Sequence, residues 1–141
     1  MAIDFKFTRM KKDITTRKDI ELLVDAFYIN VRNDKDIGFI FTEIAAVNWD
    51  KHVPIMYDFF ENMLFYTGSY TGNPMELHKH INHLFPLKAA HFIKWNQLFC
   101  SSVDDLFTGK TAKLVKERAK SISAVMQIKI LKESASSDAV F

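Results

Sequence analysis

An all-α protein is the fold class that the sequence predicts, and three observations favour it. Apolar side chains recur at steps of three and four residues over several long stretches, which is the spacing of amphipathic helices. No stretch alternates convincingly with the period of two that a half-buried strand requires. Glycine and proline, with 4 and 3 of the 141 residues, are too rare for the many turns of a β-sandwich.

The clearest predicted helix covers about residues 17–33. Thr16 is a suitable N-cap, and Asp19, three positions later, can complete a capping box. The polar residues 33–36 and Gly38 end the helix, and residues 37–41 are apolar but too few for a long helix. One face of the helix carries the apolar side chains Ile20, Leu23, Val24, Phe27, Tyr28 and Val31.

Four further helices follow from the same periodicity. The second helix contains Pro54, which costs least in a first helical turn, and Gly68 is expected to stop it. Gly109 is expected to end the fourth helix of the series. The expected ranges are about residues 48–66, 74–81, 87–107 and 111–132.

A single domain is expected from the length of the chain. Hydrophobic residues make up 48% and charged residues 26%, which is the balance of a globular protein. We expect residues 16–132 to form the domain. Residues 1–15 are expected to form a mobile basic arm, and residues 133–141 a frayed C-terminal tail.

The net charge and the cysteine content bear on the partners and the cellular compartment that we expect for the protein. A net charge of +2 is too small to indicate a nucleic-acid partner. The single cysteine, Cys100, excludes an intrachain disulfide and fits a reducing compartment. No apolar run approaches the roughly 18 residues of a membrane-spanning helix, and the N-terminus does not resemble a signal peptide. We therefore expect a cytoplasmic protein without a membrane span.

Most enzyme and metal motifs are missing from the sequence. A structural zinc site is disfavoured because Cys100 is remote from the histidines, and because no His-x3-His pair marks one helix face. There is no glycine-rich phosphate loop and no Gly-x-Ser-x-Gly nucleophile motif. Cys100 follows Phe99 on a predicted helix and is expected to be a small buried hydrophobic residue.

Four side chains with polar tips lie on helix faces that are expected to be buried: Tyr28, His52, His78 and Trp95. Each alone is more simply explained as a core residue. Burying all four without hydrogen-bond partners would destabilise the fold, because an unsatisfied buried donor costs about 1–3 kcal/mol. An iron porphyrin would use all four, with one neutral imidazole on the metal and the other tips donating to a bound diatomic ligand. The surplus of 13 phenylalanines and 6 methionines would cover the macrocycle.

Six motifs in order, and a seventh after them, resemble the truncated haemoglobins, and within them the third group. The resemblance covers about residues 20–126. The matching strings are Phe27-Tyr28-x2-Val31-Arg32, Ile37-Gly38-x-Ile40-Phe41, Trp49-x2-His52-x-Pro54-x-Met56-x2-Phe59, Gly68-x-Tyr70-x-Gly72-x-Pro74-Met75-x2-His78, Pro86-Leu87-x3-His91-Phe92-x2-Trp95-x2-Leu98-Phe99, Val103-Asp104-x-Leu106-Phe107-x-Gly109 and Arg118-Ala119-x2-Ile122.

The resemblance implies a shortened globin fold, in which two helices pack over two with haem b between them. It makes His78 the proximal ligand of a five-coordinate iron. It also places Tyr28, His52 and Trp95 around the distal side, where Met56 would face the bound ligand.

Further contacts with the cofactor are implied in the same way. Phe41 matches a phenylalanine that packs on the porphyrin, and Phe27 and Phe92 are expected among the rings that cover it. Lys94 stands where arginine is common in the family and could meet a propionate. Phe60 stands where tryptophan is frequent, which implies a smaller pocket wall.

The function that the resemblance implies is binding of oxygen and of other diatomic ligands, NO and CO. Three distal donors favour redox or detoxification chemistry on oxygen, NO or peroxide over reversible oxygen transport. Nitric oxide dioxygenase, peroxidase-like, carrier and sensor roles all stay open. Turnover would require an unidentified reductase. Two alternatives also stay open: a helical interaction module without haem, and a six-coordinate iron with His52 or Tyr28 as a second ligand.

Overall fold

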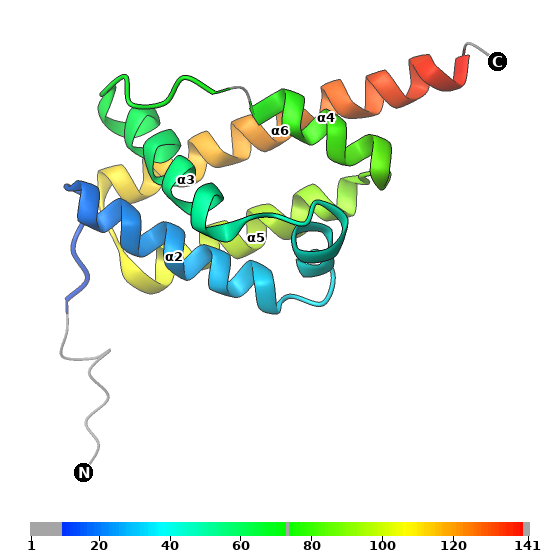
Figure 1. Ribbon diagram of the computed structural model, residues 1–141. Helices are drawn as coiled ribbons and strands as arrows, with labels where there is room; N and C mark the ends of the chain where they lie inside the picture. The colour runs from blue at the N-terminus through cyan, green and yellow to red at the C-terminus, as the bar shows by residue number, and fades with distance from the viewer. Residues whose placement is uncertain (1–9, 73, 140–141) are drawn as a thin grey trace.

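The computed structural model describes residues 10–72 and 74–139, of which residues 74–77 and 133–139 are described by their backbone alone. This part of the chain contains α-helices, one π-helix and no strand, so the prediction of an all-α protein is confirmed (Figure 1). The elements in chain order are α2 Arg17–Asn33, the π-helix η1 Ile40–Ile44, α3 Trp49–Phe65, α4 Pro74–Leu84, α5 Ala89–Leu106 and α6 Lys110–Ala139.

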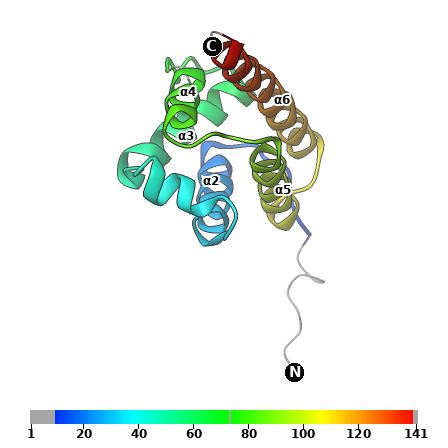
Figure 2. The same cartoon turned by 90° about the vertical axis from the view of Figure 1, so that its right-hand side faces the viewer.

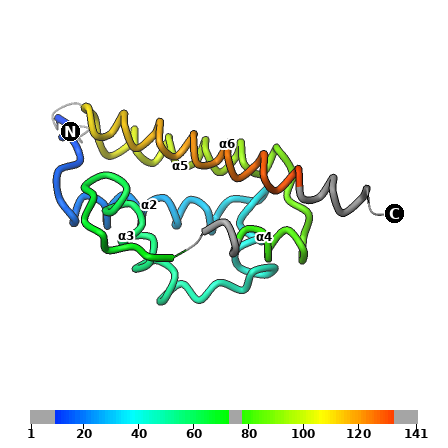
Figure 3. Tube along the Cα trace, turned by 90° about the horizontal axis from the view of Figure 1, so that it is seen from above, coloured from blue at the N-terminus to red at the C-terminus, as the bar shows by residue number. Residues whose placement is uncertain are grey.

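The helices form two layers. Helix α2 packs against α3, and α5 packs against α6. Contacts of α2 with α5 and of α3 with α6 join the two pairs. Viewed from one end, α3 and α4 lie above α2, and α6 lies above α5 (Figure 2). Seen from above, α5 and α6 form one layer and α2, α3 and α4 the other (Figure 3). The expected arrangement of two helices over two is confirmed.

Large aromatic side chains hold the layers together. Phe27 from α2, Phe60 from α3 and Phe99 from α5 are at most 1% exposed. The Phe60 and Phe99 rings stack at 5.1 Å between centroids, and the Phe27 ring meets Phe99 edge-on at 5.2 Å. Because each ring comes from a different helix, this cluster fixes the positions of α2, α3 and α5 relative to one another.

Helix α2 begins and buries its face as predicted. Thr16 accepts a hydrogen bond from the Asp19 backbone N–H, and the Asp19 carboxylate accepts one from the Thr16 backbone N–H, which completes the capping box. The buried side chains of α2 are the six that the periodicity predicted. Local sequence therefore determines this element.

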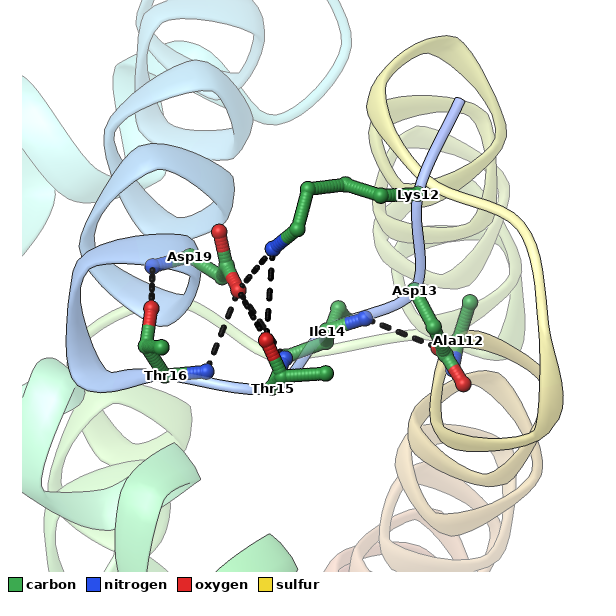
Figure 4. A network of polar contacts seen from close by, with 7 residues as sticks. All are labelled: Lys12, Asp13, Ile14, Thr15, Thr16, Asp19 and Ala112. Carbon is green, nitrogen blue, oxygen red and sulfur yellow. Dashed lines mark hydrogen bonds and ion pairs between the residues drawn. The ribbon is translucent and has the colours of Figure 1, made fainter. Parts of the chain in front are cut away.

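The segment before α2 differs from the expected mobile arm in its last residues, whereas residues 1–9 lie outside the described part of the chain. The Ile14 side chain is 1% exposed. The Asp13 carboxylate accepts hydrogen bonds from the backbone N–H groups of Thr111 and Ala112, so it caps the first turn of α6. Figure 4 shows Asp13 beside Ala112. Burial raises the pKa of Asp13, but these hydrogen bonds and one from Ile14 outweigh it and lower the pKa.

Gly109 allows this cap to form. A Cβ atom at position 109 would lie 2.5 Å from the Asp13 Cγ, and the backbone of Gly109 has a φ of 132°. Both features exclude a side chain here. The residues that precede Gly109 and Asp13 are also joined, because the Thr108 backbone N–H donates a hydrogen bond to the Lys12 carbonyl at 3.0 Å. The domain therefore includes part of the segment that was expected to be an arm.

Several helix ends also differ from expectation. Helix α3 ends at Phe65, within one residue of the expected range, but the residue that ends it is Tyr66, which adopts a left-handed conformation with a φ of 55°, and not Gly68. Pro54 lies beyond the first turn of α3, so its ring removes one backbone hydrogen bond. Helix α6 continues to Ala139, where the sequence predicted a frayed tail from residue 133. The apolar segment 37–41 leads into the π-helix.

Among the described residues, no helix is both long enough and apolar enough to cross a membrane.

Candidate functional site

A cavity of about 210 Å³ lies between the helices. This is more than ten times the roughly 10–15 Å³ that one water molecule needs. Its walls are mostly apolar and come from every helix of the described chain. They are formed by Tyr28, Ile37, Ile40, Phe41, Val47, His52, Ile55, Met56, Phe59, Phe60, Tyr70, His78, Ile81, Leu87, His91, Phe92, Trp95, Ala119, Ile122, Ser123 and Met126. A large apolar cavity with a few converging polar groups is the usual form of a small-molecule site.

Tyr28 of α2 and His52 of α3 form a hydrogen-bonded pair in one wall of this cavity. The His52 Nε2 atom lies 3.1 Å from the Tyr28 hydroxyl oxygen. Burial raises the pKa of Tyr28 well above its ordinary value, so the phenol keeps its proton. Burial, together with the charge of a nearby His78, lowers the pKa of His52. The pair is therefore uncharged at neutral pH.

His78 lies on α4 and lines the same cavity. It is half-buried, and it lies close enough to His52 for its charge to lower the pKa of the His52 imidazole. The structure thus brings together two histidines that are 26 positions apart in sequence (78 − 52). An uncharged imidazole is the form that binds a metal ion.

Trp95 of α5 faces the cavity from the second layer. Its ring stacks on Phe99 at 5.6 Å and 4° between planes, and Phe27 meets it edge-on at 5.3 Å. These contacts hold the indole in one orientation. The indole N–H is a donor only, so Trp95 can offer a hydrogen bond but cannot accept one.

The structure places all of the expected site residues in the cavity wall except Phe27 and Lys94. Phe27 is fully buried behind the wall, where it packs against Tyr28 at 4.9 Å and against Trp95. Its ring supports two residues that do line the cavity, and its direct contact with a cofactor stays a prediction.

Lys94 also lies outside the cavity wall, so its contact with a propionate stays a prediction. Its ammonium Nζ lies 3.3 Å from an Asp34 carboxylate oxygen and 3.7 Å from one of Asp36. These two carboxylates follow α2 and lie far from Lys94 in the sequence. A propionate at Lys94 would have to compete with both of them.

Sequence reasoning missed the wall contributed by α6 and several other residues. Ala119, Ile122 and Met126 of α6 line the cavity, and none of them was among the expected site residues. Ser123, which is 5% exposed, and His91 also line it. Ser123 stands in none of the matching motifs, whereas His91 is part of the motif that begins at Pro86 and could have been found from it.

Other chemistry finds little support in the described residues. They contain no group of three or more His, Cys, Asp or Glu side chains that could hold a metal ion between them. Burial raises the pKa of the Cys100 thiol, which keeps it protonated and unreactive. A metal in this cavity would therefore have to bring most of its own ligands.

Comparison with known proteins identifies the family. No family model matches the chain. The chain is 30% identical over 121 residues to Group 3 truncated hemoglobin ctb of Campylobacter jejuni, and the match covers 84% of this chain and 93% of that protein.

The fold agrees with that similarity. The structure matches the crystal structure of a group III truncated hemoglobin from Campylobacter jejuni with a TM-score of 0.75 and 29% sequence identity, over 86% of this chain and 95% of that one. The sequence and the fold point to the same family, and this chain belongs to the group III truncated haemoglobins, whose membership implies a haem cofactor.

Proposed function

We propose that this chain binds haem b with His78 as the axial ligand of the iron, and that oxygen, NO and CO bind on the side of Tyr28, His52 and Trp95. The observation that carries the proposal is the convergence of His78, the uncharged His52 imidazole and the protonated Tyr28 phenol in one apolar cavity between the helix layers. A flat macrocycle with apolar faces and one metal ion matches this combination.

The residues present fit such a group. The walls offer aromatic and aliphatic surface, including Phe41, Phe92 and Met56, to both faces of a disc. An imidazole without a charge is the ligand that haem iron takes in globins. When bound, haem supplies an iron centre that takes a diatomic ligand and can exchange electrons with it.

The motif match implies His78 as the axial ligand, and a contact that His52 makes disfavours His52 in that role. The Nε2 atom of His52 is engaged with the Tyr28 hydroxyl. A bond from His52 to a metal would break this hydrogen bond and leave a buried phenol without its partner, at a cost of about 1–3 kcal/mol. This argument also disfavours a second protein ligand on the opposite side.

The distal residues act as hydrogen-bond donors. If His52 carries its proton on Nε2, it donates to the Tyr28 oxygen, and the Tyr28 O–H is then directed to a ligand. The Trp95 N–H is a second donor that the stacking on Phe99 holds in place. Donors fixed before the ligand arrives stabilise negative charge that develops on it, at little cost in reorganisation.

We further propose that the chain carries out redox chemistry on oxygen, NO or peroxide and does not only bind them. Two or more fixed donors slow ligand release, which suits conversion of the ligand better than transport. A nitric oxide dioxygenase or peroxidase-like activity would follow, supported by a separate reductase that supplies electrons.

The test is the absorption spectrum of the purified full chain, ferric and ferrous, with and without CO. We expect a Soret band that shifts on reduction and again on addition of CO, and its loss in His78→Ala. A colourless protein that refuses added haemin would instead support a helical interaction module without haem. A ferric spectrum of the six-coordinate low-spin type that His52→Ala converts to five-coordinate would show a second histidine ligand.

A further inference from the structure

The proposed site leaves one part of haem b without a partner, the acid edge, which is the edge of the macrocycle that carries its carboxylates. Haem b carries two propionates, and a carboxylate that leaves an apolar cavity needs a hydrogen-bond donor or a positive charge beside it. Lys94 is held by Asp34 and Asp36 and does not line the cavity. Another residue has to meet this edge.

The polar residues of the cavity wall leave few choices. Tyr28 and His52 are paired with each other, and His78 is assigned to the iron. Trp95 is stacked on the Phe99 ring, and Ser123 is only 5% exposed, so neither can reach a group that extends towards solvent. Tyr70 and His91 are both half-buried and line the cavity.

Of these two, His91 has a fixed ring with one nitrogen to offer. Its Nδ1 atom accepts a hydrogen bond from the Lys88 backbone N–H at 2.9 Å. A backbone N–H can only donate, so Nδ1 carries no proton and the neutral ring carries it on Nε2. Phe85 packs against the ring at 5.7 Å and limits its rotation. Tyr70 is less restrained, since Phe59 is the only ring in contact with it among the described residues.

The surroundings of His91 favour an anion. His91 lies in the first turn of α5, an 18-residue helix whose N-terminus carries partial positive charge. Lys88, at the N-cap, is exposed and close enough that its charge disfavours protonation of His91. Burial acts in the same direction, so the ring is a neutral donor beside a fixed positive charge.

We propose that His91 binds a propionate of haem through its Nε2–H, with the charge of Lys88 beside it, and that Lys94 plays no part in holding the cofactor. This inference rests on the proposed function, because it requires that haem b occupies the cavity. It assigns to His91 a role in retaining the cofactor and in setting the orientation of its acid edge.

The test compares two cofactors that differ only at that edge. The full chain, stripped of cofactor, is loaded with haemin or with haemin dimethyl ester, in which the carboxylates are esterified. Loss of each compound to an excess of haem-scavenging apoprotein is followed by absorbance, for wild type, His91→Leu and Lys94→Met. No turnover is involved in this readout.

We expect His91→Leu to lose haemin about tenfold faster than wild type, the lower end for a hydrogen bond to a charged group. It should lose the dimethyl ester at a rate within about twofold of wild type. Lys94→Met should stay within about twofold with both compounds. Weakening of the start of α5 by the substitution would accelerate both losses equally, and equal acceleration would overturn the proposal. Unchanged loss of haemin would do the same.

A second variant at the same position controls for any weakening of the start of α5 by His91→Leu. Glutamine in place of His91 keeps an acceptor for the Lys88 N–H, as in an ordinary capping box, and also keeps a donor. His91→Gln should therefore retain haemin better than His91→Leu, and the reverse order would contradict the assignment. If wild type takes up neither compound, the proposed function itself fails. If wild type holds haemin through His78 while His91→Leu releases it normally, only the present inference fails.

Discussion

The two sides of the cavity are built differently. On one side Tyr28 and His52 lie on two 17-residue helices, are joined by a hydrogen bond, and are backed by packed aromatic rings. On the other side His78 lies on α4, an 11-residue helix that packs chiefly against α6. Helices shorter than about 12–15 residues have little stability of their own. The donor side is therefore organised by the protein, whereas the side with the metal ligand depends more on what binds there.

The largest effect that separates the two sides should come from His78. We expect His78→Gly to abolish haem binding, and added imidazole to restore a Soret band by replacing the missing ring. His80→Gly is the matched control, because it places the same weak helix former on α4 at an exposed position. A Soret band in His78→Gly without imidazole, or its loss in His80→Gly alone, would contradict the assignment.

The stability of the two sides should also differ. Phe99→Ala removes a ring that contacts Phe27, Phe60 and Trp95, and it should lower the free energy of unfolding by about 3–5 kcal/mol. Ile81→Ala on α4 should cost about 2 kcal/mol or less, because the short helix can shift to fill the space. Urea unfolding of both variants without cofactor measures the difference, and equal losses would mean that α4 is as firmly packed as α5.

A smaller effect is expected on ligand release. Tyr28→Phe and Trp95→Phe each delete one donor and keep the ring, so the oxygen dissociation rate should rise about tenfold in each. The measurement is stopped-flow displacement of oxygen by CO. An unchanged rate in Trp95→Phe would show that the indole does not act on the ligand, and would weaken the case for redox chemistry.

The smallest effect concerns pH. The pKa of His52 is lowered from its ordinary 6.5 in the folded chain. Below pH 6.5 the unfolded chain takes up a proton that folded His52 does not, so stability should fall as the pH drops through this range. His91 has a lowered pKa as well and acts in the same direction. His52→Gln should therefore reduce, but not remove, the loss of stability between pH 7.5 and pH 5.5, measured by urea unfolding without cofactor.

Most of the fold and the centre of the site could be predicted from the sequence. The spacing of apolar residues located the helices, and Thr16 with Asp19 marked the start of α2. The polar tips Tyr28 and His52 were found because each lies on an apolar helix face, and the structure places both in the cavity wall. These signals are local, since each depends on residues within a few turns of one helix.

The remainder depended on residues that are distant in sequence. Lys94 was expected to meet a propionate, but Asp34 and Asp36 hold it, and no local pattern reveals which carboxylate a lysine will reach. The Asp13 cap of α6 spans almost a hundred positions, and it placed in the domain a segment that composition alone assigned to a mobile arm.

Helix periodicity and end caps are therefore properties of the sequence by itself, because they arise from contacts within one element. Which side chains share the cavity, which ones support it from behind and which charges neutralise each other are decided only by the packing of the helices. Phe27 and His91 show the difference: a helix pattern gives the face on which a residue lies, whereas the tertiary structure decides what that face meets.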